Sequence, residues 1–545
     1  MKLTRAQLDG FEHRHCASVA DLPGLQAEVL RMILERARAS AFVRDHGITG
    51  TTVDEYRARV PVHSYDDLIP YVTRMMNGEP DVLFEGMAKA FLQTSGTTSA
   101  PKIVPDRDLS DEQRALARID DDYEIALFLR DHPDLSYHGR HLADDVGLWL
   151  PLVGGPPKLD DQGRLIGFIS GYAYDQLYRN APTFYFTRPS WLRHMSGALK
   201  LYVLARLAVS EDVRIVNGPP HAVVELARIV NGSHGDFLRD VHDGTLSREI
   251  PPALAAELPP LRPDPERARG LEELAARDGG LWPRHLWPRL AVVRTFCQAG
   301  MAVYKDFLRA GYGVPLRDIG LWSTEGRGLA YCLKTESAPS LVAAHRNFYE
   351  LVDETERAYL LHEVERGRLY RLVVTSPHGL YRYDTGDIVE VVDHVGGVPV
   401  IEVRGRAGTS NIAGEKLTES HVTEAMTAAL GPDLRRVAGF VLVPHMPSEG
   451  RRGFYELAIE YEPPLPAPDQ LAAAVEDALC RVNSIYLECC VATPAVERMR
   501  ITWLPSGWFS AFARRLLEER GMQAKLPIFW TATRPDGWPP LAREA

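Results

Sequence analysis

The sequence is poor in features that mark several specialised classes of protein. It has only 6 cysteines among 545 residues, scattered and without a C-x-x-C pair, which argues against a secreted disulfide framework and favours a reducing compartment. No apolar run approaches the roughly 18 residues that a membrane span needs. Residues 1–8 lack the apolar core of a signal peptide. We therefore expect a cytoplasmic protein.

A surplus of basic residues is also missing. The chain has 62 Lys and Arg against 73 Asp and Glu, a net charge of −11, which gives no electrostatic reason to expect nucleic acid or an anionic membrane as a partner. Internal repeats and low-complexity tracts are absent. With 45% hydrophobic and 25% charged residues, the composition is that of a globular protein, and the length predicts roughly two to four structural units.

The hydrophobic pattern alternates between helical and strand spacing along most of the chain, which predicts an α/β fold. A cluster of prolines at 251–265 predicts an exposed connection. Ser64 is a candidate N-cap for a following helix. The expected helices are at 21–46, 196–209 and 304–310, the expected strands at 213–217, 289–296 and 368–375, and a hairpin at 388–403 surrounds Gly396 and Gly397.

After about residue 408 the pattern changes. A helix around Val422, strands at 440–443 and 455–461, and a helix at 469–482 predict a compact α+β unit. We therefore place the main domain boundary near residue 405, between a large domain at 1–405 and a small domain at 406–545.

Residues 91–102 form the first stretch with recognisable chemistry. Small residues with hydroxyls and free backbone N–H groups follow a hydrophobic segment, as in an anion cradle, and Lys102 adds a mobile positive charge. Pro101 separates that lysine from the glycine, which argues against a P-loop NTPase. An ordinary surface loop is the alternative. The cradle residues are Thr94, Ser95, Gly96, Thr97 and Thr98.

A second stretch ends a predicted strand with Ser323, Thr324 and Glu325. A carboxylate near polyphosphate is useful through Mg²⁺, which bridges it to phosphate oxygens. For Glu325 taken alone, a surface or capping acid is the favoured interpretation.

Two further stretches carry single charged residues. Asp387 stands just before a predicted strand, where a carboxylate can accept hydrogen bonds from ribose hydroxyls. For this motif taken alone, a turn aspartate after Gly386 is the favoured interpretation. Lys525 lies near the carboxyl terminus and by default is a solvated lysine.

In this order, the four stretches resemble the Gretchen Hagen three family of acyl-acid amido synthetases, in the luciferase-like adenylate-forming superfamily. The resemblance covers nearly the whole chain. It also includes the segments 62–70, 77–78, 314–317, 379–383, 405–406 and 414–419.

The resemblance implies a large multi-layer α/β amino-terminal domain and a smaller mobile α+β carboxy-terminal domain, with ATP and a carboxylic acid meeting between them. It implies phosphate binding by residues 94–98, nucleotide contacts by Ser323, Thr324 and Tyr381, ribose binding by Asp387 and Mg²⁺ binding by Glu325. Lys525 would stabilise the adenylation transition state, Lys102 would neutralise phosphate charge and Arg406 would lie near the hinge.

The chain departs from the family pattern at two points. Leu321, followed by Trp322, stands where the family usually has tyrosine, and the terminal motif at 523–528 lacks its arginine.

The implied reaction is adenylation of a carboxylic acid by ATP, followed by transfer of the acyl group to an amino acid or other amine. Transfer to the thiol of coenzyme A or a carrier protein is the nearest alternative, and a catalytically inactive nucleotide- or acid-binding protein is the second. We expect a monomer. A zinc site at His132, His138 and His141 is disfavoured because these residues lie in a polar segment without a helix to align them.

Overall fold

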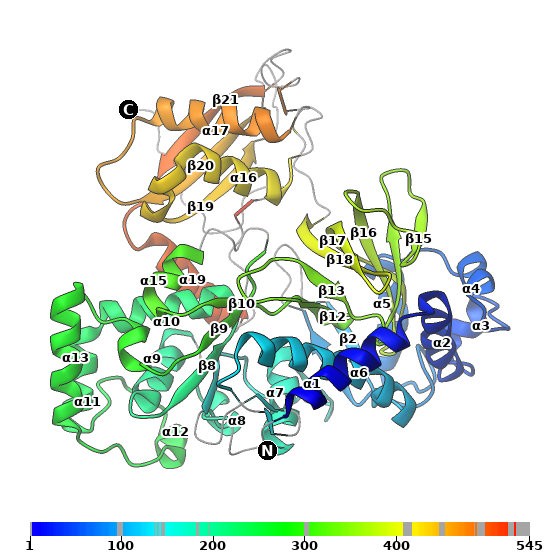
Figure 1. Cartoon of the computed structure of the whole chain (residues 1–545), viewed down its shortest axis with the longest axis horizontal. Helices are drawn as coiled ribbons and strands as arrows, with labels where there is room; N and C mark the ends of the chain where they lie inside the picture. Colours follow the sequence, from blue (N-terminus) through cyan, green and yellow to red (C-terminus); the bar gives the residue numbers. More distant parts are fainter. Residues whose placement is uncertain are drawn as a thin grey trace.

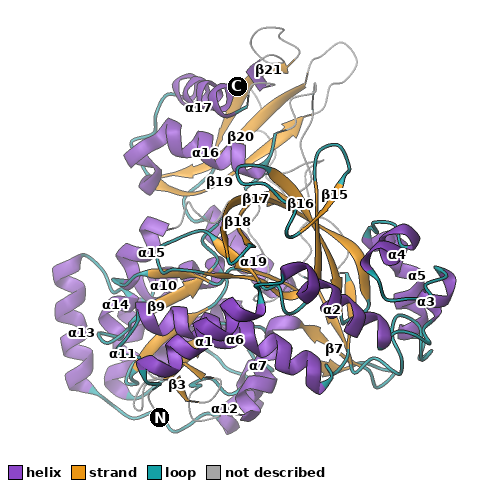
Figure 2. Ribbon diagram, turned by 45° about the vertical axis from the view of Figure 1, so that its right-hand side comes forward, coloured by secondary structure: helices purple, strands orange, loops and turns teal. Residues whose placement is uncertain are grey.

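The computed structural model describes residues 3–94, 102–135, 137–138, 141–142, 148–180, 185–195, 197–298, 305–406, 412, 417–445, 453–483, 486–487, 496–520 and 528–529. Its strands form several sheets, and the last of these, with its two covering helices, stands apart at the top of Figure 1. Helices and strands are mixed along the whole chain (Figure 2). Within these residues, no helix is both long and apolar enough to cross a membrane.

The amino-terminal helices pack against the largest sheet. The helix predicted at 21–46 is two helices, α2 (Leu22–Glu35) and α3 (Ala41–Asp45), because the Ser40 hydroxyl accepts a hydrogen bond from the Val43 N–H at 3.2 Å and begins a new helix. Ser64 caps α5 (Tyr65–Met76), as predicted, and Asp67 accepts from its backbone N–H at 2.8 Å. The neighbouring helices are α1 (Arg5–Ser18), α4 (Val53–Arg59) and α6 (Asp111–Asp131).

The largest sheet has eight antiparallel strands in the order β11-β12-β13-β18-β17-β16-β14-β15. The predicted hairpin around Gly396 and Gly397 is present, but its first strand begins earlier, so Asp387 lies inside a strand and not before one. The strands are β11 (Leu321–Ser323), β12 (Arg327–Cys332), β13 (Ser340–Val342), β14 (Phe348–Val352), β15 (Ala358–Leu360), β16 (Leu369–Ser376), β17 (Leu380–Val395) and β18 (Val398–Arg406).

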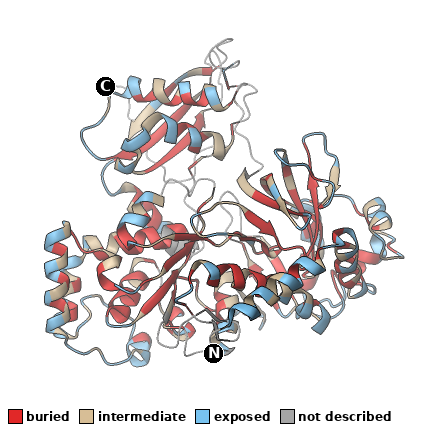
Figure 3. Cartoon of the chain, in the orientation of Figure 1, coloured by how far each residue is buried: buried red, intermediate tan, exposed pale blue. Residues whose placement is uncertain are grey.

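A parallel sheet in the order β10-β9-β8-β5 forms the centre of a second core. Its strands are buried while α11 and α13 keep exposed outer faces (Figure 3), as expected for a parallel sheet covered by helices. The strands are β5 (Leu148–Pro151), β8 (Val213–Asn217), β9 (Val292–Thr295) and β10 (Leu316–Asp318). The helices are α7 (Ile169–Asn180), α8 (Pro189–Leu192), α9 (Gly197–Ala208), α10 (Pro220–Gly232), α11 (His234–Asp243), α13 (Pro265–Asp278), α14 (Pro283–Leu286) and α15 (Lys305–Tyr312).

The segment 251–265, predicted as a loop, contains the short helix α12 (Pro252–Glu257). The prediction treated the prolines as helix breakers, but Pro252 is compatible with the first turn of a helix. The helix is stabilised by Leu254, which is fully buried.

A small mixed sheet has the strand order β2-β1-β7-β6, and β5 of the second core lies between its strands β2 and β6 in the sequence. Its strands are β1 (Ala90–Gln93), β2 (Ile103–Asp106), β6 (Lys158–Leu159) and β7 (Leu165–Phe168), and a separate two-stranded ladder pairs β3 (Tyr137–His138) with β4 (His141–Leu142).

The carboxy-terminal unit has its own core around a three-stranded sheet. Its last helix, α19 (Trp508–Arg520), packs Phe509 and Phe512 against the sheet and also lies against α9 and α10 of the large unit (Figure 1). Arg228 of α10 donates to the Ala438 carbonyl at 2.9 Å, so the two units are in direct contact. The other elements are α16 (Glu419–Leu430), η2 (Gly431–Arg436), β19 (Val437–His445), β20 (Gly453–Tyr461), α17 (Pro468–Val482) and β21 (Val496–Trp503).

Candidate active site

The cradle stretch is closed at its base by a β-hairpin. β1 and β2 pair antiparallel, and beyond their ends the Thr94 N–H donates to the Lys102 carbonyl at 2.9 Å while the Lys102 N–H donates to Thr94 Oγ1 at 3.1 Å. Ser95, Gly96, Thr97 and Thr98 lie outside the described residues. The structure therefore fixes the two ends of the predicted cradle and brings Thr94 beside Lys102.

The Lys102 ammonium lies between two tyrosines from other parts of the chain. Its Nζ donates to the Tyr383 hydroxyl at 2.9 Å and lies 5.5 and 5.6 Å from the ring centres of Tyr65 and Tyr383, within cation–π range. Tyr383 of β17 is fully buried. The Tyr65 hydroxyl, at the start of α5, accepts from the Ile103 N–H at 2.6 Å and donates to the Ile103 carbonyl at 2.8 Å.

Glu325 lies in the turn between β11 and β12. It is 6% exposed, and the described residues offer its carboxylate no hydrogen bond and no ion pair. Burial raises the pKa of Tyr65, and the negative charge of Glu325 raises it further, which places this carboxylate within electrostatic range of the tyrosine. Thr324 is buried beside it, and Ser323 Oγ accepts from the Gly326 N–H at 3.0 Å.

An ion-pair cluster joins this turn to the hairpin. Arg327 donates to Asp106 Oδ1 at 2.7 Å, and His378 Nδ1 lies 3.0 Å from the same oxygen. Burial alone would raise the pKa of Asp106, but the His378 and Arg327 partners outweigh it and hold that pKa below its ordinary value. Lys102 and Glu325 are thus attached to one rigid framework.

The remaining predicted site residues are distributed as follows. Asp387 pairs in register with Arg406 across β17 and β18, is 5% exposed, and donates from its backbone N–H to Thr385 Oγ1 at 3.1 Å. Tyr381 is part of the core: its ring stacks on Phe42 with centroids 4.2 Å apart and its hydroxyl donates to the Leu83 carbonyl. Lys525 lies outside the described residues.

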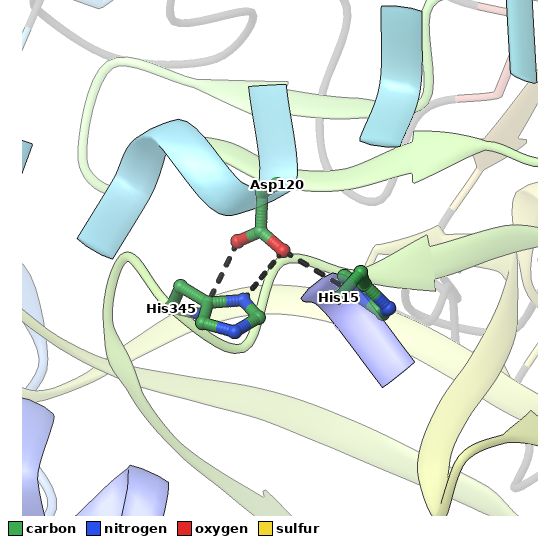
Figure 4. Close-up of side chains that lie close together, drawn as sticks. All are labelled: His15, Asp120 and His345. Atoms are coloured by element: carbon green, nitrogen blue, oxygen red, sulfur yellow. Dashed lines mark hydrogen bonds and ion pairs between the residues drawn. The ribbon is translucent and has the colours of Figure 1, made fainter. Parts of the chain in front are cut away.

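A second polar cluster, absent from the sequence predictions, joins α1, α6 and the segment after β13 (Figure 4). Asp120 Oδ1 lies 2.7 Å from His345 Nδ1 and 3.7 Å from His15 Nε2, and all three side chains are buried. The Tyr331 hydroxyl lies 3.1 Å from His15 Nε2, and Ser18 Oγ lies 2.7 Å from His345 Nε2. Burial lowers the pKa of His15 to about 4, so its ring is neutral at pH 7.

The 2.7 Å distance between Asp120 Oδ1 and His345 Nδ1 is that of a hydrogen bond, so these two side chains are bonded directly to each other. Together with the contacts of Tyr331 and Ser18, they form one buried hydrogen-bonded network. Of the three histidines that the sequence placed together, His132 is buried with Nε2 3.0 Å from Thr335 Oγ1.

Family models match most of the chain. Residues 17–314 match the GH3 family N-terminal domain and residues 340–406 match the GH3 family central domain. The chain belongs to the GH3 family. The resemblance given by the ordered motifs is therefore confirmed.

Relatives of known name are distant in sequence. A jasmonoyl--L-amino acid synthetase of Oryza sativa subsp. japonica is 24% identical over 455 residues, 75% of each chain. An indole-3-acetic acid-amido synthetase of Arabidopsis thaliana is 23% identical over 517 residues, which cover 89% of this GH3 chain and 85% of the relative.

Solved structures confirm the predicted fold class. The GH3.15 acyl acid amido synthetase in complex with 2,4-DB superposes with a TM-score of 0.80 at 18% identity, covering 98% of this chain and 95% of that one. A 2-hydroxyisobutyryl-CoA ligase in the postadenylation state gives a TM-score of 0.52 at 12% identity, covering 91% of both chains. The chain shares its fold with both enzymes.

Sequence reasoning missed Tyr65 and Tyr383 as site residues, although both stand inside the motifs that carried the resemblance, 62–70 and 379–383. Neither residue type nor spacing shows that these tyrosines meet at Lys102, since Tyr383 is 281 residues away from it.

Proposed function

We propose that this chain is an ATP-dependent acyl-acid amido synthetase that activates a carboxylic acid as its adenylate and transfers the acyl group to an amino acid. The observation that carries the proposal is that a lysine-ended cradle lies near a buried carboxylate that has no ion-pair partner among the described residues: the Thr94–Lys102 hairpin end and the Glu325 turn approach each other at Tyr65. Membership of the GH3 family supports the proposal. So do the names of the relatives, a jasmonoyl--L-amino acid synthetase and an indole-3-acetic acid-amido synthetase.

In the first step, a carboxylate oxygen of the acid attacks the α-phosphorus of ATP. The bond between that phosphorus and the bridging oxygen breaks, and pyrophosphate leaves. Because little covalent chemistry is required of the protein, its work is alignment and stabilisation of charge. The N–H groups of the cradle, Lys102 and a lysine of the small domain, Lys525, supply positive charge around the phosphates.

In the second step, the amine nitrogen attacks the acyl carbon of the adenylate. The C–N bond forms, AMP leaves, and the nitrogen releases a proton to solvent. Arg406 ends β18, where the eight-stranded sheet gives way to the carboxy-terminal unit. A hinge at this point would let the small domain present different faces in the two steps.

Glu325 is the proposed Mg²⁺ ligand. A hard carboxylate oxygen suits Mg²⁺, and a buried carboxylate without a protein cation among the described residues is suited to receive one. When bound, Mg²⁺ would neutralise charge on the polyphosphate. Asp387 would accept hydrogen bonds from the ribose, and Ser323 and Thr324 would lie along the nucleotide.

The decisive experiment is ATP–pyrophosphate exchange with a panel of aryl and alkyl acids, including jasmonic acid, indole-3-acetic acid and 2,4-DB. Each active acid is then supplied with single amino acids or with coenzyme A, and the products are identified by mass spectrometry. An amide with AMP release supports the proposal. A thioester alone replaces it with an acyl-thiol ligase, and ATP binding without exchange across the panel replaces it with a binding protein.

The proposed setting is a reducing, cytoplasmic one, in which the protein acts on small molecules as a monomer. The described cysteines Cys16, Cys297, Cys332 and Cys480 are all free thiols, which supports a reducing compartment.

A further inference from the structure

Lys102 lies directly before β2, and its side chain donates to Tyr383. Tyr65 holds the first residue of β2 in place. Two Tyr65 hydrogen bonds, at 2.6 and 2.8 Å, hold both the N–H and the carbonyl of Ile103, the residue after Lys102. The backbone that carries the lysine is therefore tied to the start of α5.

The end of the lysine side chain is held separately. Four rotatable bonds give a lysine many conformations, and ordering them costs conformational entropy. The hydrogen bond from Lys102 Nζ to the Tyr383 hydroxyl at 2.9 Å selects one of them, and the flanking rings of Tyr65 and Tyr383 add cation–π attraction. Tyr383 lies on β17 and its side chain is fully buried, so the surrounding core restricts the position of its hydroxyl.

A tyrosine hydroxyl is a suitable partner for a lysine that must act on phosphate. It accepts one hydrogen bond and leaves the other N–H groups of the ammonium for phosphate oxygens, and as a neutral group it does not cancel the positive charge. A carboxylate in its place would form an ion pair and compete with the nucleotide. Glu325, the nearby carboxylate, makes no ion pair with Lys102.

We propose that Tyr383 is a positioning residue that holds the Lys102 ammonium toward the polyphosphate of ATP, with Tyr65 fixing the adjacent residue Ile103 at the start of β2. This inference rests on the proposed function, since it assigns a new role within the same site. It concerns the nucleotide alone.

Tyr383→Phe tests the inference, because it removes the hydroxyl and keeps the ring. Tyr312→Phe is the matched control: it is the same change at another fully buried tyrosine, on α15, whose hydroxyl donates to the Val223 carbonyl at 2.7 Å. Losing one hydrogen bond to a charged group should weaken Mg-ATP binding and raise the KM for ATP about tenfold in Tyr383→Phe, with the KM for the acid unchanged.

A double-mutant cycle with Lys102→Met separates positioning from a general structural role. Mg-ATP affinity is measured by calorimetry for the wild type, both single variants and the double variant. If Tyr383 acts through Lys102, Tyr383→Phe causes no further loss of affinity once Lys102 is replaced. Equal losses of affinity in the wild-type and Lys102→Met backgrounds, or equal effects of Tyr383→Phe and Tyr312→Phe, would overturn the inference.

The binding readout also separates this inference from the proposed function. If no acid supports exchange in the wild type but the calorimetric cycle shows coupling, the reaction is wrong and the positioning role stands. If exchange occurs and the cycle shows no coupling, the reaction stands and the role of Tyr383 is wrong. A wild-type protein that binds no Mg-ATP contradicts both.

Discussion

Arg327 Nη2 donates to Asp106 Oδ1 at 2.7 Å, and this ion pair links the turn that carries Glu325 to the strand that follows the cradle. Both side chains are largely buried, with side-chain exposures of 15% and 7%. The two halves of the proposed ATP site, which are more than two hundred residues apart in sequence, are thereby held at a fixed distance.

Asp106→Asn should therefore weaken both stability and adenylation. Breaking a buried ion pair leaves Arg327 without its counter-charge, which typically costs about 3–5 kcal/mol. The measurements are the urea midpoint and the exchange rate. Lys89→Ala, which removes a solvent-exposed pair with Asp108 on the same hairpin, is the control and should cost less than about 1 kcal/mol.

The Asp106 carboxylate should also make the free energy of unfolding sensitive to acid. Because its folded-state pKa lies below the ordinary value of 3.8, its stabilisation is complete above that value and is lost as the pH falls through the lower, folded-state pKa. The free energy of unfolding of the wild type should therefore fall more steeply than that of Asp106→Asn when the pH is lowered below about 4. Parallel pH profiles for the two proteins would contradict this prediction.

The ionisation of Glu225 should change the free energy of unfolding with pH in the opposite direction. It is a buried carboxyl on α10, facing Arg228 and Arg514, and burial raises its pKa from 4.5 to about 7. The folded state then favours the protonated form, so ionisation destabilises the protein as pH rises from 4.5 to about 7. Glu225→Gln should be more stable than the wild type at neutral pH by on the order of 3 kcal/mol, with the difference vanishing below pH about 4.5. Thermal unfolding at several pH values measures it.

The pair formed by Arg382 and Glu350 should be important for folding. The guanidinium donates to both carboxylate oxygens, at 2.7 and 2.9 Å, and also to the Val60 carbonyl at 2.6 Å. Glu350→Gln leaves a buried cation without its charge partner and should lower the free energy of unfolding by about 3–5 kcal/mol. Arg31→Gln removes exposed pairs with Glu28 and Glu35 and should change it by less than about 1 kcal/mol.

Removal of the metal should abolish exchange, and Mg²⁺ should restore it. Glu325→Gln keeps the size of the side chain but removes its charge, so it should lower the exchange rate at least about tenfold and raise the Mg²⁺ concentration needed for half-maximal rate. Glu354→Gln, the same change at an exposed carboxylate outside this turn, should leave the Mg²⁺ requirement unchanged. A Glu325→Gln enzyme with the wild-type Mg²⁺ dependence would refute the assignment of this ligand.

Several features follow from the local sequence. The cap at Ser64, strand β8 at Val213–Asn217 and the hairpin around Gly396 and Gly397 are where the sequence predicts them. Each depends on hydrogen bonds or on side-chain periodicity within a few residues, which the sequence displays directly. The order of the four motif stretches likewise identified the family.

Secondary structure predicted from local sequence patterns was wrong where contacts between distant segments determined it. The predicted helix at 21–46 breaks after Ser40, where the N–H groups of Ala41 and Phe42 donate to the carbonyls of Asp81 and Val82 at 2.8 and 3.0 Å. The helix α12 forms in a proline-rich segment because Leu254 packs into the buried core. Asp387 lies inside a strand because β17 extends back to Leu380 to pair with β16. In each case contacts with distant segments outweighed the local preference.

The candidate site divides in the same way. The sequence by itself determined the chemical groups: the hydroxyls and lysine of the cradle, the carboxylate Glu325 and the family to which they belong. Only the tertiary structure brought Tyr383 to Lys102 across 281 residues, and Arg327 to Asp106 across 221. Such contacts depend on the packing of complete sheets and helices, which no window of the sequence contains.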